Sequence, residues 1–294
     1  MIDLLLPTIS QGLLWSLLAL GVYITFRVLD IADLTVEGSF PLGASVAVTL
    51  LVKDVNPVTA ILAAALAGGI SGVVTGLLHT KLKIPALLAG ILTMIALYSV
   101  NLRIMGKANI SLLGKETAFT VLENALGVAY SQAVLLVGIL SCVVFSAFMY
   151  WFFGTEIGAA IRATGYNPQM IRAQGVDTNG MLLIGLFFSN ALVAVAGSLV
   201  AQSNGFADVG MGVGTIVIGL ASVIIGEVLF GTRSFKNSLI SVILGSIVYR
   251  LVIAIVLQMG MPPNDLKLFT AVLVAIALSL PMVKGKFQSR KAGL

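Results

Sequence analysis

Charged residues are scarce in this sequence. Asp, Glu, Lys and Arg make up 10% of the 294 residues and hydrophobic residues make up 59%, whereas soluble domains average roughly 25% charged and 45–50% apolar residues. Apolar runs of about 17–22 residues recur along the whole chain, and about 20 helical residues cross the hydrocarbon core of a bilayer. The composition therefore excludes a soluble protein and predicts one that spans a membrane repeatedly.

The sequence also lacks the residues and motifs of most enzymes. Its one cysteine, Cys142, lies in an apolar run, and its one histidine, His79, lies at the expected end of another. There is thus neither a disulfide framework nor a CxxC metal pair. No HExxH motif, G-x-x-x-x-G-K-[ST] phosphate loop or nucleophile elbow is present. We expect no metal, cofactor or catalysis in this chain, and a partner would have to supply the energy.

Nine apolar windows predict an all-α, polytopic transmembrane bundle that forms one domain over residues 1–294, with about eight to ten helices. The first window follows no basic n-region or A-x-A cleavage site, so we expect it to be retained. A short or re-entrant piece is expected within 103–129 or 203–214. The expected helices are 8–26, 36–52, 57–78, 84–102, 130–153, 181–201, 213–230, 238–257 and 268–283.

The net charge of +5 reflects membrane topology, because the basic residues lie in loops and form no aromatic-interleaved patch for nucleic acid. Basic residues favour cytoplasmic loops, and alternate sides of the predicted bundle hold eleven and five of them. The richer side is therefore predicted to be cytoplasmic, together with the C-terminus and loop 154–180, and the odd helix count places the N-terminus outside. That side has Arg27, Lys81, Lys83, Arg162, Arg172, Arg233, Lys236, Lys284, Lys286, Arg290 and Lys291; the other has Lys53, Arg103, Lys107, Lys115 and Lys267.

Two short segments resemble each other. IADLTVEG (31–38) and FADVGMGV (206–213) each precede a glycine-rich apolar helix, and the predicted topology places them at opposite faces. An inverted-topology repeat would produce this arrangement, and transporters often bind substrate where such repeats meet. Only Ala and Asp match outright, so chance similarity is the alternative.

The loop 154–180 is the longest polar stretch on the predicted cytoplasmic side. Asn167 can cap a helix whose first position is Pro168, and Gly175 suits the left-handed residue after its last turn. This pattern predicts a short helix over Pro168 to Gln174, with Asp177 or Thr178 capping the next helix. So short a helix needs a partner surface. The partner is either the bundle itself or a groove on another protein that receives exposed side chains such as Tyr166, Met170, Ile171 and Arg172.

Two segments carry a family resemblance. EIGAAIRATGYNPQMIRAQGVD resembles the cytoplasmic signature of permeases of branched-chain amino acid and ribose ABC importers, and IADLTVEGSFPLGASVA is similar to their "NLAHGE…LGA" stretch. The resemblance implies a permease in the bacterial cytoplasmic membrane, a second permease copy, ABC ATPase subunits that bind ATP and Mg, and an extracellular substrate-binding lipoprotein. It implies that the ATPase-coupling residues are Glu156, Arg162, Gly165, Tyr166, Asn167, Pro168, Met170, Ile171, Arg172 and Gly175.

Further segments narrow the resemblance. ADLTVEGSF, ILTMIALYSVNLRIMGKANI and YRLVIAIVLQMGMPPNDLKLFTA are most similar to permeases that serve receptors for aromatic amino acids, tryptophan or tyrosine. Thr35-Val36 replaces the Ala-His that is typical of the branched-chain group. The resemblance therefore favours aromatic over branched-chain substrates.

Four residues are candidates for the translocation path or its gate: Thr35, Glu37, Asn101 and Arg250. Arg250 lies about 20 Å along its expected helix, and intramembrane charges usually face the bundle interior or a cavity. It either pairs within the bundle or meets a substrate carboxylate. Glu37 begins a helix, where the dipole favours a carboxylate, so it is either a helix-start residue or a gate with Thr35.

Basic residues at the predicted outer mouth are candidates for receptor docking. Arg103, Lys107 and Lys115 could meet receptor carboxylates, or they could belong to an ordinary solvated loop, since exposed ion pairs contribute little. One rival function is an ion-coupled secondary transporter of a small organic solute, with residues 206–214 as the broken helix that such proteins use. A lipid-modifying enzyme is disfavoured because no catalytic cluster is apparent.

Overall fold

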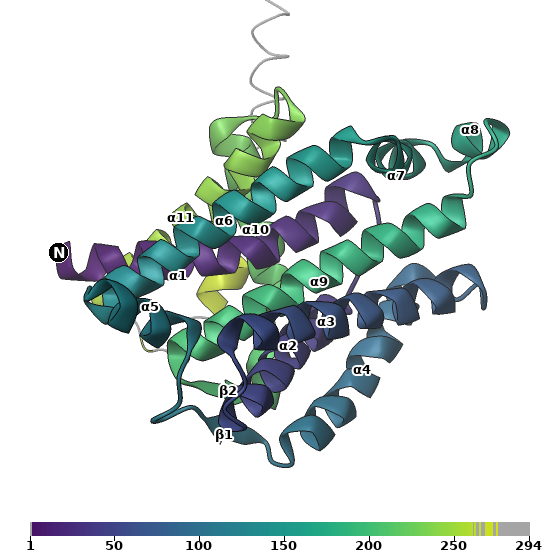
Figure 1. Cartoon of the computed structure of the whole chain (residues 1–294). Coiled ribbons are helices and arrows are strands. Elements are labelled where there is room, and N and C mark those ends of the chain that lie inside the picture. The colour runs from purple at the N-terminus through teal and green to yellow at the C-terminus, as the bar shows by residue number, and fades with distance from the viewer. Residues whose placement is uncertain (1, 261, 263–264, 266–267, 273–274, 276–294) are drawn as a thin grey trace, which may run out of the picture.

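The computed structural model describes residues 2–260, 262, 265, 268–272 and 275, and it is a bundle of long helices (Figure 1). Among these residues, seven helical segments are long and apolar enough to cross a membrane, and α2 is a shorter apolar helix. The principal helices are α1 (Ile2–Tyr23), continued by the π-helix η1 (Ile24–Val28), then α2 (Val36–Val52), α3 (Pro57–Thr80), α4 (Ala86–Met105), α6 (Tyr130–Gly154), α9 (Thr178–Asn204), α10 (Thr215–Phe230) and α11 (Phe235–Gln258).

Helix α9 is the centre of the bundle. In its most apolar window 72% of the residues are buried, against 28% for α4 and for α6. Helices α1, α2 and α3 pack around α9, whereas α4 and α6 leave much of their apolar surface exposed. Because lipid tails are as apolar as these side chains, we assign the exposed surfaces to lipid or to another subunit.

Helices α2 and α9 approach so closely that their backbones touch. A Cβ atom added at Gly197 would overlap the carbonyl oxygen of Phe40 on α2. Small residues allow such contacts, which replace the hydrophobic driving force that is missing between helices in lipid. The α2–α9 contact therefore fixes the position of α2, whose first turn carries Glu37.

Two segments interrupt the long α-helices, and the first turn of α2 connects them. Residues 29–35 precede α2; β2 (Phe206–Asp208) and the 3₁₀-helix η2 (Val209–Gly212) precede α10. Asp33 Oδ1 accepts the N–H of Thr35 at 2.9 Å, and Asp208 Oδ1 accepts that of Gly210 at 2.7 Å. Glu37 Oε1 then accepts the N–H of Gly214 at 3.0 Å. IADLTVEG and FADVGMGV thus share one local turn. The expectation that they lie at opposite faces is wrong, because Gly212 packs directly against the backbone of Glu37.

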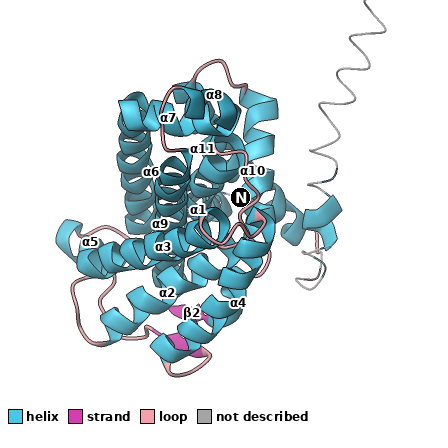
Figure 2. Ribbon diagram, turned by 90° about the vertical axis from the view of Figure 1, so that its right-hand side faces the viewer, coloured by secondary structure: helices cyan, strands magenta, loops and turns pink. Residues whose placement is uncertain are grey.

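The structure confirms the helical fold class and adds elements that the apolar windows miss. These are α5 (Ala118–Leu126), α7 (Glu156–Tyr166), α8 (Pro168–Ala173) and an antiparallel pair of β2 with β1 (Asn109–Ser111). Figure 2 shows how small the strands are among the helices. The extra pieces expected within 103–129 and 203–214 are β1, α5, β2 and η2. The expected helix 268–283 lies mostly outside the described residues.

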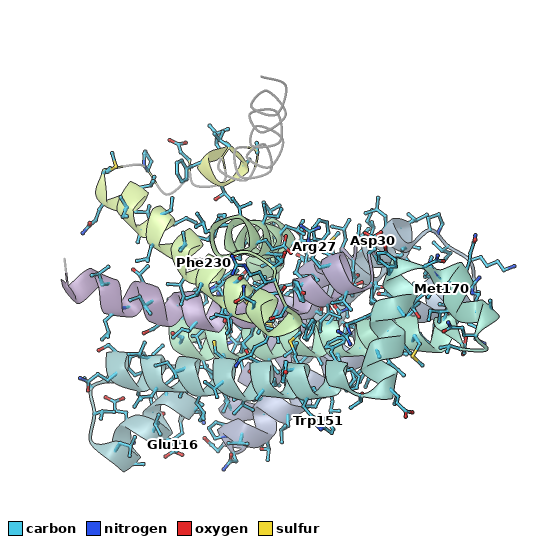
Figure 3. The ribbon with its side chains drawn as sticks, turned by 90° about the horizontal axis from the view of Figure 1, so that it is seen from above. Arg27, Asp30, Glu116, Trp151, Met170 and Phe230 are labelled. Atoms are coloured by element: carbon cyan, nitrogen blue, oxygen red, sulfur yellow. The ribbon has the colours of Figure 1, made fainter. Side chains whose placement is uncertain are left out.

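The two ends of the bundle carry different elements. One end, called here the α7–α8 end, holds α7, α8 and the turns after η1, α3 and α10; the other, the β end, holds β1, β2 and α5. Met170 and Glu116 mark these opposite ends (Figure 3). The predicted sides therefore agree with the fold for the described basic residues. The α7–α8 end has Arg27, Lys81, Lys83, Arg162, Arg172, Arg233 and Lys236, and the β end has Lys53, Arg103, Lys107 and Lys115.

The α2–α9 contact predicts the effect of adding one methyl group. Gly197→Ala forces the α2 and α9 backbones apart, and overpacking of this kind typically costs about 1–3 kcal/mol. We expect a lower midpoint of thermal unfolding in detergent, followed by fluorescence-detected size-exclusion chromatography. Gly154→Ala is the matched control, because nothing lies within 4 Å of a Cβ atom at that position. Equal midpoints for the two variants would contradict the packing described.

Candidate functional site

The α7–α8 end carries a helical connector whose ends are capped as predicted. Asn167 Oδ1 accepts the N–H of Met170 at 3.0 Å, and Gly175 has the left-handed backbone (φ +84°) that ends the segment after α8. Asp177 Oδ1 accepts the N–H of Asn179 at 3.0 Å and so caps α9. The short helix spans Pro168–Ala173, with Gln174 as its C-cap, which confirms the expectation from sequence.

Helix α7 precedes α8 and rests directly on the end of η1. Thr155 Oγ1 accepts the N–H of Gly158 and begins the helix. A Cβ atom at Gly165 would overlap the carbonyl oxygen of Val28, so glycine is required where α7 crosses η1. The Arg162 guanidinium lies 5.5 Å from the ring centre of Phe235 on α11. A displacement of α7 would therefore change its contacts with η1 and α11.

Helix α8 is anchored by one buried side chain. Ile171, which we expected among the exposed side chains, is only 5% exposed, so this expectation is wrong. The Arg172 Nε donates to Thr178 Oγ1 at 2.7 Å and ties α8 to α9. Tyr166 is 91% exposed and Met170 47%. We call Tyr166, Met170 and Arg172 the coupling surface.

An ion pair that the sequence did not predict lies near α7. Arg27 on η1 donates to both carboxylate oxygens of Glu227 on α10, with the Nε–Oε1 bond at 2.9 Å. Figure 3 shows Arg27 beside Asp30 in the chain that leads to α2. The available signal was a cation and a carboxylate at the same end of two predicted helices. The pair holds η1 and α10 together near Tyr166 of the coupling surface.

The half of the bundle nearer the β end contains a second candidate site, a cavity of about 350 Å³ between α2, α4 and η2. Both Glu37 and Asn101 line it, as does Tyr98, which sequence reasoning did not single out. Asn101 is fully buried, and its Nδ2 donates to the carbonyl of Gly38 at 3.4 Å. Its Oδ1 has no hydrogen-bond partner among the described residues.

Thr35 lies in a buried polar network at the start of α2. Its hydroxyl is 2.7 Å from that of Thr75 on α3, which donates to Thr93 on α4 at 2.8 Å. Asn190 Nδ2 on α9 donates to Asp33 Oδ2 at 2.8 Å. These bonds tie the chain before α2 to three helices, and Thr35 itself is not among the residues lining the cavity.

Arg250 is separate from the other path candidates. Its guanidinium lies 4.1 Å from the ring centre of Trp15 on α1, and Trp15 in turn packs against Phe40 on α2. Its Nε has no hydrogen-bond partner in the described part of the chain. The residue does not line the cavity with Glu37 and Asn101, and it packs instead against the Trp15 ring.

The three receptor-docking candidates all lie at the β end. Arg103 and Lys107 are exposed. Lys115 instead forms an ion pair with Asp54, with its Nζ 2.8 Å from Oδ1. Two of the three cations are thus exposed. The third, Lys115, connects the segment before α5 to the turn after α2.

Comparison with known proteins addresses the identity of the chain. Residues 4–278 match the family described as the permease component of the branched-chain amino acid transport system. A tyrosine transport system permease of Clostridioides difficile is 40% identical over 94% of this chain and 90% of its own length. The ribose import permease of Escherichia coli K12 is 24% identical over 84% of this chain and 75% of its own length.

A solved structure has a similar fold. An ABC transporter of the metal-chelate type, in an inward-facing conformation, superposes with a TM-score of 0.51 over 96% of this chain and 85% of its own, at 12% sequence identity. The similarity concerns the fold alone. The family match over most of the sequence and the 40% identical relative show that the chain belongs to the branched-chain amino acid transport permease family and is the membrane-spanning permease component of an ABC transporter, not an enzyme.

Proposed function

We propose that this chain is the permease of an ATP-driven, binding-protein-dependent importer of an aromatic amino acid, tyrosine or tryptophan. The observation that carries the proposal is the 40% identity to a tyrosine transport permease over almost the full length of both chains. The departure from the branched-chain pattern at Thr35-Val36 supports the same substrate class. A binding lipoprotein would deliver the amino acid at the outer face.

The charge distribution supports the orientation within the bacterial cytoplasmic membrane. We place the α7–α8 end in the cytoplasm because basic residues predominate there, and the β end outside. This orientation puts the start of α1 outside. The cytoplasmic C-terminus predicted from the sequence lies outside the described residues. Arg103 and Lys107 then face the receptor, whereas Lys115 contributes less because Asp54 already neutralises it.

The ATPase is a separate subunit in this proposal. The chain has no phosphate loop, so ATP and Mg would bind to a partner ATPase that contacts the coupling surface. Two permease copies would work on two ATPase subunits. Closure of the ATPases would move α7 and α8, and the different affinity of nucleotide for the two states would switch access to the cavity. The contact of Gly165 with Val28 supports α7 as the element that transmits this movement.

Reconstituted transport tests the proposal. The permease, the ATPase and the receptor should together import tyrosine or tryptophan into proteoliposomes only when ATP reaches the ATPase, and an ionophore should leave uptake unchanged. Leucine uptake measures the branched-chain alternative in the same vesicles. Uptake that survives without ATP but stops when the ion gradient collapses would instead establish the ion-coupled transporter, for which the interruption at 206–214 is the relevant feature.

The coupling surface predicts a separable defect. Tyr166→Ala and Met170→Asp should reduce co-purification of the ATPase and abolish ATP-driven uptake, because each removes exposed contact area from the docking face. Insertion and thermal stability of the permease should stay normal, since neither side chain is buried. Met259→Asp is the control, as Met259 is 81% exposed beyond the other end of α11. Full assembly and uptake in the Tyr166 and Met170 variants would show that the loop is only a connector.

A further inference from the structure

The cavity between α2, α4 and η2 is lined by an acidic residue and by no basic one among the described residues. The acidic residue is Glu37. At low dielectric a single carboxylate attracts a cation much more strongly than it does in water. The cavity is therefore suited to the positive rather than the negative group of a ligand.

A second acceptor lies in the same lining. The weak bond from Asn101 Nδ2 to the Gly38 carbonyl orients the amide, so that its Oδ1 is left as an acceptor without a partner. Burying an unpaired acceptor costs free energy, roughly 1–3 kcal/mol, unless a ligand or water satisfies it. Glu37 uses Oε1 to hold Gly214, and its other carboxylate oxygen accepts no hydrogen bond from the described residues. One carboxylate oxygen and one amide oxygen thus remain for a donor with several N–H groups.

Apart from Ser99, the rest of the lining is mainly apolar. Tyr98, which is 55% exposed, stands with Met94 and Ile95 on α4, and Pro41 and Val213 close the other sides. A volume of about 350 Å³ lies in the usual range for small-molecule sites, roughly 300–1,000 Å³. An aromatic side chain fits such a wall, and offset or edge-on packing against Tyr98 is the favoured geometry.

We propose that this cavity is a recognition site for the transported amino acid, in which Glu37 and Asn101 Oδ1 accept hydrogen bonds from its ammonium group and Tyr98 packs against its ring. This assignment rests on the proposed function for the identity of the ligand. The site is formed where the first turn of α2, which carries Glu37, meets η2 and Gly214.

A thiol at the cavity wall can report occupancy without transport. Ser99 lines the cavity and is exposed, whereas the native Cys142 is buried, so Ser99→Cys in a Cys142→Ser background gives one accessible thiol. The purified permease–ATPase complex is treated with a maleimide in the presence of L-tyrosine or of 3-(4-hydroxyphenyl)propionate, which lacks the ammonium group. We expect tyrosine to slow labelling several-fold and the deamino compound to leave the labelling rate unchanged.

Two variants assign the acceptors. Glu37→Gln keeps an oxygen for the Gly214 N–H but removes the charge, and Asn101→Leu removes the free acceptor. Each should raise the tyrosine concentration for half-protection by about tenfold to a hundredfold, the range for a lost hydrogen bond to a charged group. Glu116→Gln, an exposed carboxylate at the β end, should leave protection unchanged.

The outcomes separate this inference from the proposed function. Equal protection by tyrosine and the deamino compound, or unchanged protection in both acceptor variants, would overturn the ammonium assignment while tyrosine uptake by the intact importer continued. Absence of protection by tyrosine in a complex that imports tyrosine would overturn the site altogether. Failure of the intact importer to transport any aromatic amino acid would instead refute the proposed function and, with it, the ligand named here.

Discussion

The hydrogen bond from Gly214 to Glu37 joins the two places where the helical bundle is interrupted, and the rest of the structure depends on that junction. Inside a bilayer every backbone polar group needs a protein partner, so non-helical segments are tolerated only where they are buried in protein or line a cavity. Asp33 and Asp208 each accept a backbone N–H within their own segment, and Glu37 in the first turn of α2 accepts the N–H of Gly214. The cavity, the buried threonine network and the start of α10 all follow from this arrangement.

The junction and the coupling surface share the same scaffold. Helix α9 begins beside α8, where Arg172 bonds Thr178, and reaches the junction through Asn190, which bonds Asp33. At the α7–α8 end, η1 supports α7 and is paired through Arg27 with Glu227 on α10, the helix whose start Glu37 holds. Two continuous routes of packed helix therefore connect the exposed Tyr166 and Met170 to the cavity. This geometry suits a subunit that converts movement of a partner at one end into altered access near the other.

Helix caps and long apolar helices could be predicted from the sequence, whereas packing between distant residues could not. The caps at Asn167 and Asp177, the end at Gly175 and the long apolar helices were predicted because each depends on a few adjacent residues. Helix α7 was missed because it is short and amphipathic, and β1 with β2 because distant parts of the chain pair. Ile171 was expected to be exposed, yet its burial depends on how α8 lies on the bundle. Glu37 and Asn101 were chosen from sequence, but Tyr98 and the Thr75–Thr93 link were not, since only the approach of α2, α3 and α4 gives them a role.

In the proposed mechanism, nucleotide binding by an ATPase at the α7–α8 end changes the cavity between α2, α4 and η2. Spin labels at Ile95→Cys and Val213→Cys, in a Cys142→Ser background, would face this cavity from α4 and from the residues before α10. Pulsed electron–electron double resonance on the complex of permease and ATPase measures the distance between the two spin labels with and without trapped ATP. We expect the distance distribution to shift when ATP is trapped. An identical distribution in both states, in a complex that hydrolyses ATP and imports its substrate, would contradict it.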